Sequence, residues 1–327
     1  MEKSLKVEQV KPKKEKKHKL FSTKQARENI TGWLFVLPLI IYFIVFQLAP
    51  MIISFVISLN DWNMRTPMKF VGFENYTHLL TNYQGLFDDF WPSLVVTVKY
   101  ILLTVPASVI LVLVVAALLN SKVRGEGIFK TIFYIPSVTS GVAIAAIWMF
   151  MVDPQHGMIN QLLGTHISFL ATKSTALYTL AVMAIWGGLG YNTLIMLSAM
   201  KGINESLYEA AEIDGAGAFK KFIHVTIPSV TPIIFFISIT SVIGAFQAFD
   251  QMYLTTGGGP EKSTMTYMLG LYNQAFEYNN MGIACAMSYI LFAIIMVITF
   301  IQFKVQPQNM DNGTGGKKKR GNKKRKK

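Results

Sequence analysis

The chain has 327 residues, of which 52% are hydrophobic and only 15% are charged. Soluble globular domains carry about 25% charged residues, so this composition indicates a protein that crosses a membrane several times rather than a soluble globule. The single cysteine, Cys285, can form no intrachain disulfide and belongs to no Cys/His cluster, so the sequence supports neither a disulfide scaffold nor a metal site.

The net charge of +13 lies at the two ends of the chain. Residues 1–30 carry a charge of +6 and residues 304–327 carry +9, which leaves −2 for everything between them. The basic runs in these tails contain no aromatic side chains and no groove-binding motif. Contact of basic cytoplasmic tails with anionic lipid is therefore favoured over binding of RNA or DNA.

Six apolar stretches lie between the tails, in residues 31–303. Each has about 20 to 27 residues, enough to cross a hydrocarbon core of about 30 Å as a helix. The first is too long for a cleavable signal peptide and lacks a small-residue cleavage site, so we expect it to stay in the membrane. The sequence therefore predicts an all-α integral membrane protein with six transmembrane helices. The predicted spans are residues 33–59, 94–119, 131–152, 176–200, 233–252 and 283–303.

Lys and Arg are distributed unevenly between the two sides of this arrangement. The two tails and the connections 120–130 and 201–230 hold 26 of the 31, and the connections on the other side hold four. Cytoplasmic loops of membrane proteins are enriched in Lys and Arg, so both termini are predicted to be cytoplasmic. The remaining one, Lys99, lies inside the outer end of the second span, where its stem can reach the interface.

The connection 202–231 is the longest predicted cytoplasmic loop. Asn204 is a suitable N-cap for a short helix over about residues 205–213, and Gly215 suits the left-handed conformation that ends helices. A second helical segment from about residue 216 is expected to run toward Pro228, with an aromatic edge on one face. Two short helices with such an edge form an element suited to docking against a partner.

The same loop resembles the EAA loop of permeases from type I ABC importers. Phe219 stands where that family usually has Trp, a substitution that is conservative in shape. The resemblance extends over residues 33–302, and the segments 70–76 and 254–260 are most similar to the sugar-importing branch. The matching loop positions are Glu209, Ala210, Ala211, Asp214, Gly215, Ala216, Phe222 and Pro228.

This resemblance implies a six-helix permease of a prokaryotic cytoplasmic membrane that imports a sugar, most commonly a di- or oligosaccharide, by alternating access. It implies a separate ABC ATPase that binds ATP and Mg²⁺ and holds the loop in a cleft. It also implies an extracellular or periplasmic solute-binding protein and a second homologous permease chain that completes a heterodimer.

The chain itself lacks the motifs of an ATP-binding protein or a hydrolase. Residues 125–131 contain a Lys-Thr pair, but the glycine spacing is not that of a phosphate-binding loop. All five histidines lie outside the predicted spans, and neither GxSxG nor HExxH occurs. We therefore expect a transporter subunit without catalytic residues or a cofactor of its own.

Polar and aromatic residues in the fourth and fifth spans are candidates for the substrate pathway. The fourth span contains a glycine-rich stretch that we interpret as a break in the helix. Polar groups inside a membrane normally face a cavity or a partner helix, although the glycines and the tryptophan are equally suited to close packing. The candidates are Trp186, Tyr191, Asn192 and Gln247.

The outer connection after the fifth span contains three consecutive glycines and a proline. Glycine allows close approach of another backbone, which suits a docked binding protein, but it also suits a simple turn. Both interpretations stay open for these residues, which are Gly257, Gly258, Gly259 and Pro260.

An ion-coupled secondary carrier or a channel is the alternative class. Such proteins usually bury ionisable residues in the middle of the membrane and often show inverted repeats. The sequence shows neither feature. The need for a separate ATPase distinguishes the two classes.

Overall fold

The computed structural model describes residues 23–81, 86–121 and 125–305, and these residues are almost entirely helical. Their sheet is one short antiparallel pair, β1 (Asn60–Asp61) and β2 (Lys69–Phe70). The chain divides into two compact units, residues 1–54 and 55–327.

The first unit contributes a single long apolar helix, formed by α1 (Thr23–Phe43), η1 (Ile44–Leu48) and the start of α2 (Ala49–Ser58). Residues 28–58 are long and apolar enough to span a membrane, so the first predicted span is confirmed. The middle element, η1, is a π-helical turn that ends two residues before Pro50. The proline ring would clash with a carbonyl one turn earlier in a regular α-helix, and the wider turn avoids this clash.

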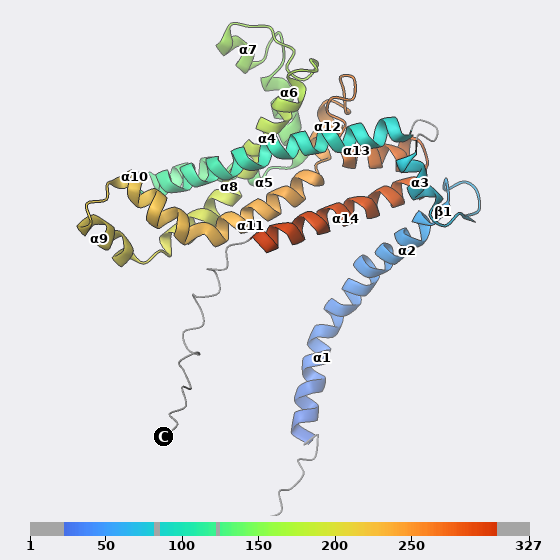
Figure 1. Cartoon of the computed structure of the whole chain (residues 1–327), viewed down its shortest axis with the longest axis horizontal. Coiled ribbons are helices and arrows are strands. Elements are labelled where there is room, and N and C mark those ends of the chain that lie inside the picture. The colour runs from blue at the N-terminus through green and yellow to red at the C-terminus, as the bar shows by residue number, and fades with distance from the viewer. Residues whose placement is uncertain (1–22, 82–85, 122–124, 306–327) are drawn as a thin grey trace, which may run out of the picture. The chain divides into compact units, whose positions relative to one another are not determined.

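In the second unit, four long helices lie side by side (Figure 1). They are α4 (Leu86–Asn120), α8 (Ala176–Lys201), α11 (Ile227–Phe246) and α14 (Met281–Val305). Val112, Met196 and Ile237 of three of these helices share one core, and Tyr100 of α4 and Leu180 of α8 share another with Met252, which follows α11. The predicted second, fourth and sixth spans are thus confirmed, although α4 begins earlier than expected.

The third predicted span is broken. It consists of α5 (Glu126–Val138) and α6 (Gly141–Met151), which meet at an angle of 106°. Thr139 and Ser140 between them are extended, and the Ser140 hydroxyl accepts a hydrogen bond from the Ala143 N–H at 3.3 Å, which caps α6. The predicted span over 131–152 thus corresponds to a bent pair of helices, and the sequence did not reveal this bend because both halves are apolar and hydropathy does not detect a cap between them.

The fifth span begins and ends earlier than predicted. One continuous helix runs from α10 (Ala218–Lys221) through the π-helical turn η2 (Phe222–Thr226) into α11, and Pro228 lies in its first α-helical turn after η2. The helix stops at Gln247, and α12 (Asp250–Thr255) is a separate element. The described residues therefore contain five helices that could span a membrane, or six when the bent pair counts as one.

The fourth span has no break. The helix α8 is regular through residues 186–192, so the predicted interruption was wrong. A Cβ at Gly190 would lie 2.1 Å from the carbonyl oxygen of Phe133 on α5. This glycine is therefore required by the close packing of α8 against α5, one of the two roles that the sequence left open.

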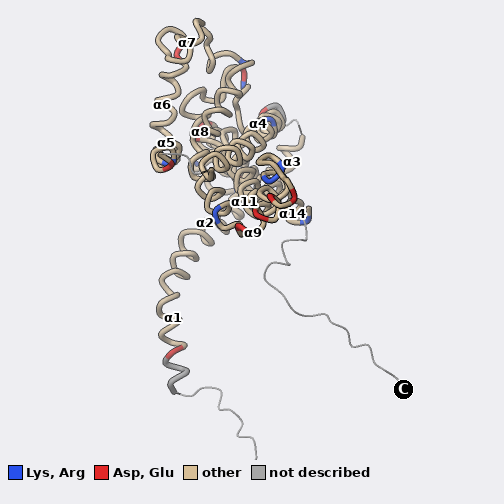
Figure 2. The backbone as a smooth tube through the Cα atoms, turned by 90° about the vertical axis from the view of Figure 1, so that its left-hand side faces the viewer, with Lys and Arg blue, Asp and Glu red and all other residues tan. Residues whose placement is uncertain are grey.

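Short elements close the two ends of the bundle. At one end lie α3 (Glu74–Leu80) and the β1–β2 pair, and at the other lies α9 (Glu205–Ile213), next to α10 (Figure 1). The helices α7 (Met158–Leu163), α12, α13 (Tyr267–Tyr272) and the π-helical turn η3 (Asn273–Glu277) complete the chain. In Figure 2 most of the backbone tube carries no charged residue, as the apolar composition requires.

Candidate functional site

A cavity of about 970 Å³ lies between α4, α6, α8, the α11–α12 turn, α13 and α14. This volume is at the upper end of the range for small-molecule sites. Its wall contains hydroxyl, amide and carboxylate side chains, and it contains no Lys, Arg or His among the described residues. The polar lining consists of Tyr100, Thr104, Ser108, Asn192, Ser241, Gln247, Asp250, Gln251 and Ser288.

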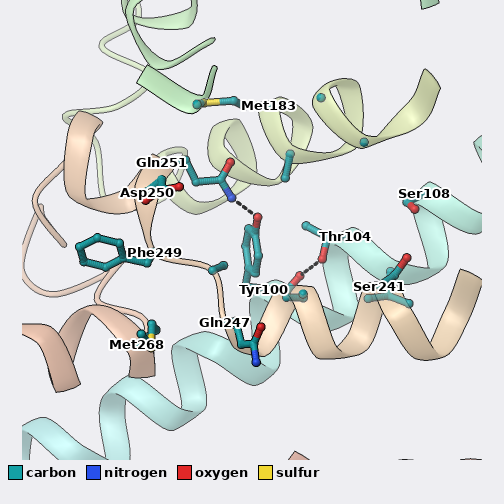
Figure 3. A pocket seen from close by; sticks show the side chains of 18 of the residues that line it. Tyr100, Thr104, Ser108, Met183, Ser241, Gln247, Phe249, Asp250, Gln251 and Met268 are labelled. Atoms are coloured by element: carbon teal, nitrogen blue, oxygen red, sulfur yellow. Dashed lines mark hydrogen bonds between the residues drawn. The ribbon is translucent and has the colours of Figure 1, made fainter. Parts of the chain in front are cut away.

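A hydrogen bond from the Gln251 amide to the Tyr100 hydroxyl ties α12 to α4 on the cavity wall (Figure 3). Tyr100 is only 1% exposed, so its ring is fixed by packing while its hydroxyl meets the cavity. The Thr266 hydroxyl donates to the Ala248 carbonyl at 2.9 Å, and this bond holds the turn that follows Gln247. The polar groups of the cavity are therefore positioned by bonds between helices.

The structure separates the four predicted pathway residues into two pairs. Asn192 and Gln247 line the cavity. Trp186 and Tyr191 are not part of its lining; Trp186 makes an edge-on contact with Trp148, with ring centroids 6.1 Å apart, and Tyr191 is 57% exposed. Adjacent residues of α8 thus point in different directions, as helical geometry requires.

The polar cavity residues that α4 contributes are not among the residues predicted from the sequence. Tyr100, Thr104 and Ser108 are spaced four residues apart, so they lie on one face of the helix and meet the same cavity. This spacing is readable in the sequence. Ser241 on α11 and Gln251 on α12 carry no such signal, because only the packing of their helices brings them to the cavity.

A row of four aromatic rings continues from the cavity wall along α12, α13 and η3. Phe249 lines the cavity and stacks on Tyr253 at a centroid distance of 5.1 Å. Tyr272 contacts both of these rings and also Phe276, which is exposed. The hydrogen bond with Tyr253 raises the pKa of the Tyr272 hydroxyl. Rings of this kind offer flat apolar faces next to the polar cavity.

At the opposite end of the bundle, α9 begins and ends at the predicted residues. The Asn204 side chain accepts a hydrogen bond from the Ser206 N–H at 3.1 Å, as expected of an N-cap. The Ala216 N–H donates to the Ala211 carbonyl at 2.9 Å, and Gly215 has a φ of 75°. This is a Schellman motif, and the left-handed backbone is the reason for glycine at its centre.

The surface of α9 is acidic, with apolar side chains beside it. The side-chain carboxylates of Glu205, Glu209 and Asp214 have no hydrogen-bond or ion-pair partner within the described part of the chain. Ile213 is 87% exposed and Phe219 is 76% exposed. The remaining matched positions, Ala210, Ala211, Phe222 and Pro228, lie on α9, η2 and α11, and Phe222 packs against the core formed by α4, α8 and α11.

The glycine-rich outer loop folds into a compact turn. Gly257 and Gly258 have φ values of 57° and 90°, which favour glycine. A Cβ at Gly258 would lie 2.5 Å from the terminal methyl of Met265. Gly259 and Pro260 follow, and the Gly259 carbonyl accepts a hydrogen bond from the Thr264 hydroxyl at 2.7 Å. The left-handed backbone thus accounts for glycine at position 258, and the end of the Met265 side chain would in addition have to move to admit a Cβ.

Two ion pairs fasten this outer loop to other elements. Glu261 pairs with Lys173 at 2.8 Å, and Lys262 pairs with Asp89 of α4. The hydrogen bond with Lys173 lowers the pKa of the Glu261 carboxyl. Both pairs are largely exposed, so they orient the loop more than they stabilise the protein.

Residues 87–309 match the family described as binding-protein-dependent transport system inner membrane component. The match covers more than half of the chain, and the chain therefore belongs to this family of membrane permeases. The long apolar helices agree with an integral membrane protein.

Within the family, the chain is similar to several transport proteins of known name. It is 35% identical to the lactose transport system permease protein LacF of Rhizobium radiobacter, over 84% of this chain and 93% of LacF. It is 32% identical to the trehalose/maltose transport system permease protein MalF of Thermococcus litoralis, over 88% of this chain and 97% of MalF.

The fold is also that of a solved transporter. The chain superposes with a TM-score of 0.75 on a chain of a bacterial alginate ABC transporter in complex with an alginate pentasaccharide-bound periplasmic protein. The two chains are 20% identical over 85% of this chain and 94% of the other, so this likeness establishes the fold alone.

Proposed function

We propose that the chain is the transmembrane permease subunit of an ATP-driven, binding-protein-dependent importer of a sugar, with a di- or oligosaccharide as its cargo. The observation that carries this proposal is the cavity, which combines hydroxyl and amide side chains with an adjoining row of aromatic rings. Sugars are held by hydrogen-bonding groups and by aromatic faces. Similarity to permeases named for lactose and for trehalose and maltose transport supports the same cargo class.

The work of transport comes from a separate ABC ATPase that binds ATP and Mg²⁺, and this chain has no ATP site or catalytic residue of its own. The free carboxylates of α9 and the exposed side chains of Ile213 and Phe219 suit a partner cleft with basic and apolar groups. Closure of the ATPase then moves the loop and alternates access to the cavity. The coupling residues are Glu209, Ala210, Ala211, Asp214, Gly215, Ala216, Phe219, Phe222 and Pro228.

Two further partners complete the importer. An extracellular or periplasmic solute-binding protein delivers the sugar at the outer loop that contains Gly257 and Pro260, and a second homologous permease chain forms a heterodimer with this one. Both termini lie in the cytoplasm of a prokaryotic cell, where the basic tails contact anionic lipid of the plasma membrane.

Purification of the chain from its host in mild detergent, with mass spectrometry of the bound proteins, tests the partners. Recovery of an ATPase and a second permease supports the proposal. The complex is then placed in liposomes, and ATP is supplied on either side of the membrane in separate experiments. Uptake of labelled lactose, trehalose, maltose and arabino-oligosaccharides is measured. ATP-dependent uptake of one of them, stimulated by the binding protein, is the expected result.

The ion-coupled carrier predicts a different outcome of the same experiment. Such a carrier purifies without an ATPase and takes up sugar in response to a proton or sodium gradient. Uptake driven by an ion gradient in the absence of ATP would replace the importer by this class.

A further inference from the structure

The helix α9 is fastened by two side-chain links to the helix that follows it in the chain. The hydroxyls of Tyr208 and Thr226 share a hydrogen bond of 2.9 Å, and the Lys221 ammonium contacts the Glu212 carboxylate at 2.5 Å. Thr226 is only 6% exposed, so the first link is sheltered from water. Both links end on the same continuous helix, residues 218–246.

On its other side, α9 is joined to α8 by the short segment 202–204. Across the described residues, no side-chain hydrogen bond or ion pair joins α9 to α8. Lys201 at the end of α8 pairs instead with Glu126 of α5 at 2.8 Å. The short segment that contains Gly202 is therefore the place where the direction of α9 can change.

The helix to which α9 is fastened extends from the cytoplasmic end to the cavity. A helix of this length spans about 40 Å. Ser241 and Gly244 near its far end line the cavity, as does Gln247 directly after it. A rotation of the end of this helix that carries α9 must therefore displace the cavity wall at the other end, because a packed helix moves as a rigid element.

We propose that Tyr208 and Thr226 form a positioning link, supported by Glu212 and Lys221, that makes α9 and the helix 218–246 move as one body about residues 202–204. The cavity wall that carries Ser241 is then the part of this chain that ATP-driven movement of α9 displaces first. This inference rests on the proposed function, because a partner ATPase must move α9.

The test measures movement at the cavity without requiring a transported sugar. In the assembled complex, with Cys285→Ser and Ser241→Cys in this chain, the labelling rate of residue 241 by a water-soluble methanethiosulfonate is compared without nucleotide and with ATP plus vanadate. We expect nucleotide to change this rate severalfold. In Tyr208→Phe and in Thr226→Val, we expect the nucleotide-dependent change to fall by about threefold or more, while the ATPase still co-purifies.

Two controls make the result specific to the link. The double variant Tyr208→Phe/Thr226→Val should lose no more of the change than either single variant, since both remove the same bond. Lys201→Gln breaks the ion pair between α8 and α5 and should retain the nucleotide-dependent change in labelling rate. The link would be overturned if the single variants kept the full nucleotide-dependent change in labelling rate. It would also be overturned if the losses in the two single variants multiplied in the double variant, or if Lys201→Gln lost as much of the change as they do.

The outcomes separate this inference from the proposed function. A nucleotide-dependent change at residue 241 in a complex that imports none of the sugars tested would refute the sugar assignment and leave the link intact. A complex that imports sugar with no movement at residue 241 would refute the link alone.

Discussion

Two loops of the second unit, the α9 loop and the glycine-rich outer loop, both contain glycine with a positive φ, but for different reasons. At Gly215, φ is 75° and no atom lies within 4 Å of the position that a Cβ would occupy. At Gly258, φ is 90° and a Cβ would overlap the side chain of Met265. The first glycine shapes an exposed surface, whereas the second is buried in its own turn.

The comparison shows that the same sequence signal reports on two different requirements. An exposed helix end needs glycine for its backbone conformation alone, and other residues that tolerate a left-handed conformation can replace it. A buried turn needs glycine for its conformation and for its volume. Substitutions at the two positions should therefore affect different properties of the protein.

The largest effect on stability is expected for Gly258→Val. Left-handed strain together with overpacking against Met265 should lower the free energy of unfolding by about 2–5 kcal/mol. The midpoint of thermal unfolding in detergent measures this loss. Gly257→Val is the matched control, because the introduced side chain is the same and the φ of 57° is also left-handed but the surroundings are open, so it should cost less, about 1–2 kcal/mol. Equal losses in the two variants would contradict the packing argument.

The second prediction concerns coupling. Gly215→Val places a β-branched residue in the left-handed conformation and should distort the end of α9, which lowers ATP-driven uptake by about tenfold or removes the ATPase from the complex. Gly215→Asn should retain most of the uptake, since Asn tolerates this conformation. Wild-type transport by the valine variant would count against the assignment of this loop to ATPase coupling.

A third prediction sharpens the distinction between cavity and surface within α8. Asn192→Ala removes a cavity amide and should raise the KM for the imported sugar by about tenfold, the expected effect of one lost hydrogen bond. Tyr191→Ala alters the adjacent, exposed residue and should leave the KM within about twofold. Uptake kinetics in liposomes measure both KM values. A larger increase in KM for Tyr191→Ala than for Asn192→Ala would place the substrate pathway elsewhere.

The smallest effect is expected from the ion pair between Glu261 and Lys173 in the outer loop. The folded protein lowers the pKa of Glu261, so the pair contributes at neutral pH and its contribution disappears as the pH falls through that lowered value. The midpoint of thermal unfolding should therefore be slightly higher in wild type than in Glu261→Gln at pH 7, and the difference between the two should shrink as the pH is lowered. If the difference between the two unfolding midpoints grew as the pH fell, it would contradict a lowered pKa of Glu261 in the folded protein.

The sequence determined the membrane class, the number of apolar segments and the ends of α9. These features depend on local properties: the length of an apolar run, and the capping residues Asn204 and Gly215, which act within one turn of the helix. The spacing of Tyr100, Thr104 and Ser108 was equally local and was available to sequence reasoning, although their role was not recognised.

Only the tertiary structure decided where the third span bends, which polar residues share the cavity and why Gly190 is present. The bend after Val138 lies between two apolar helices that hydropathy does not distinguish. Asn192 and Ser241 line the same cavity because α8 and α11 pack together, and Gly190 faces the Phe133 carbonyl because α5 lies against α8. Each of these features depends on contacts between residues that are distant in the chain, which no local pattern encodes.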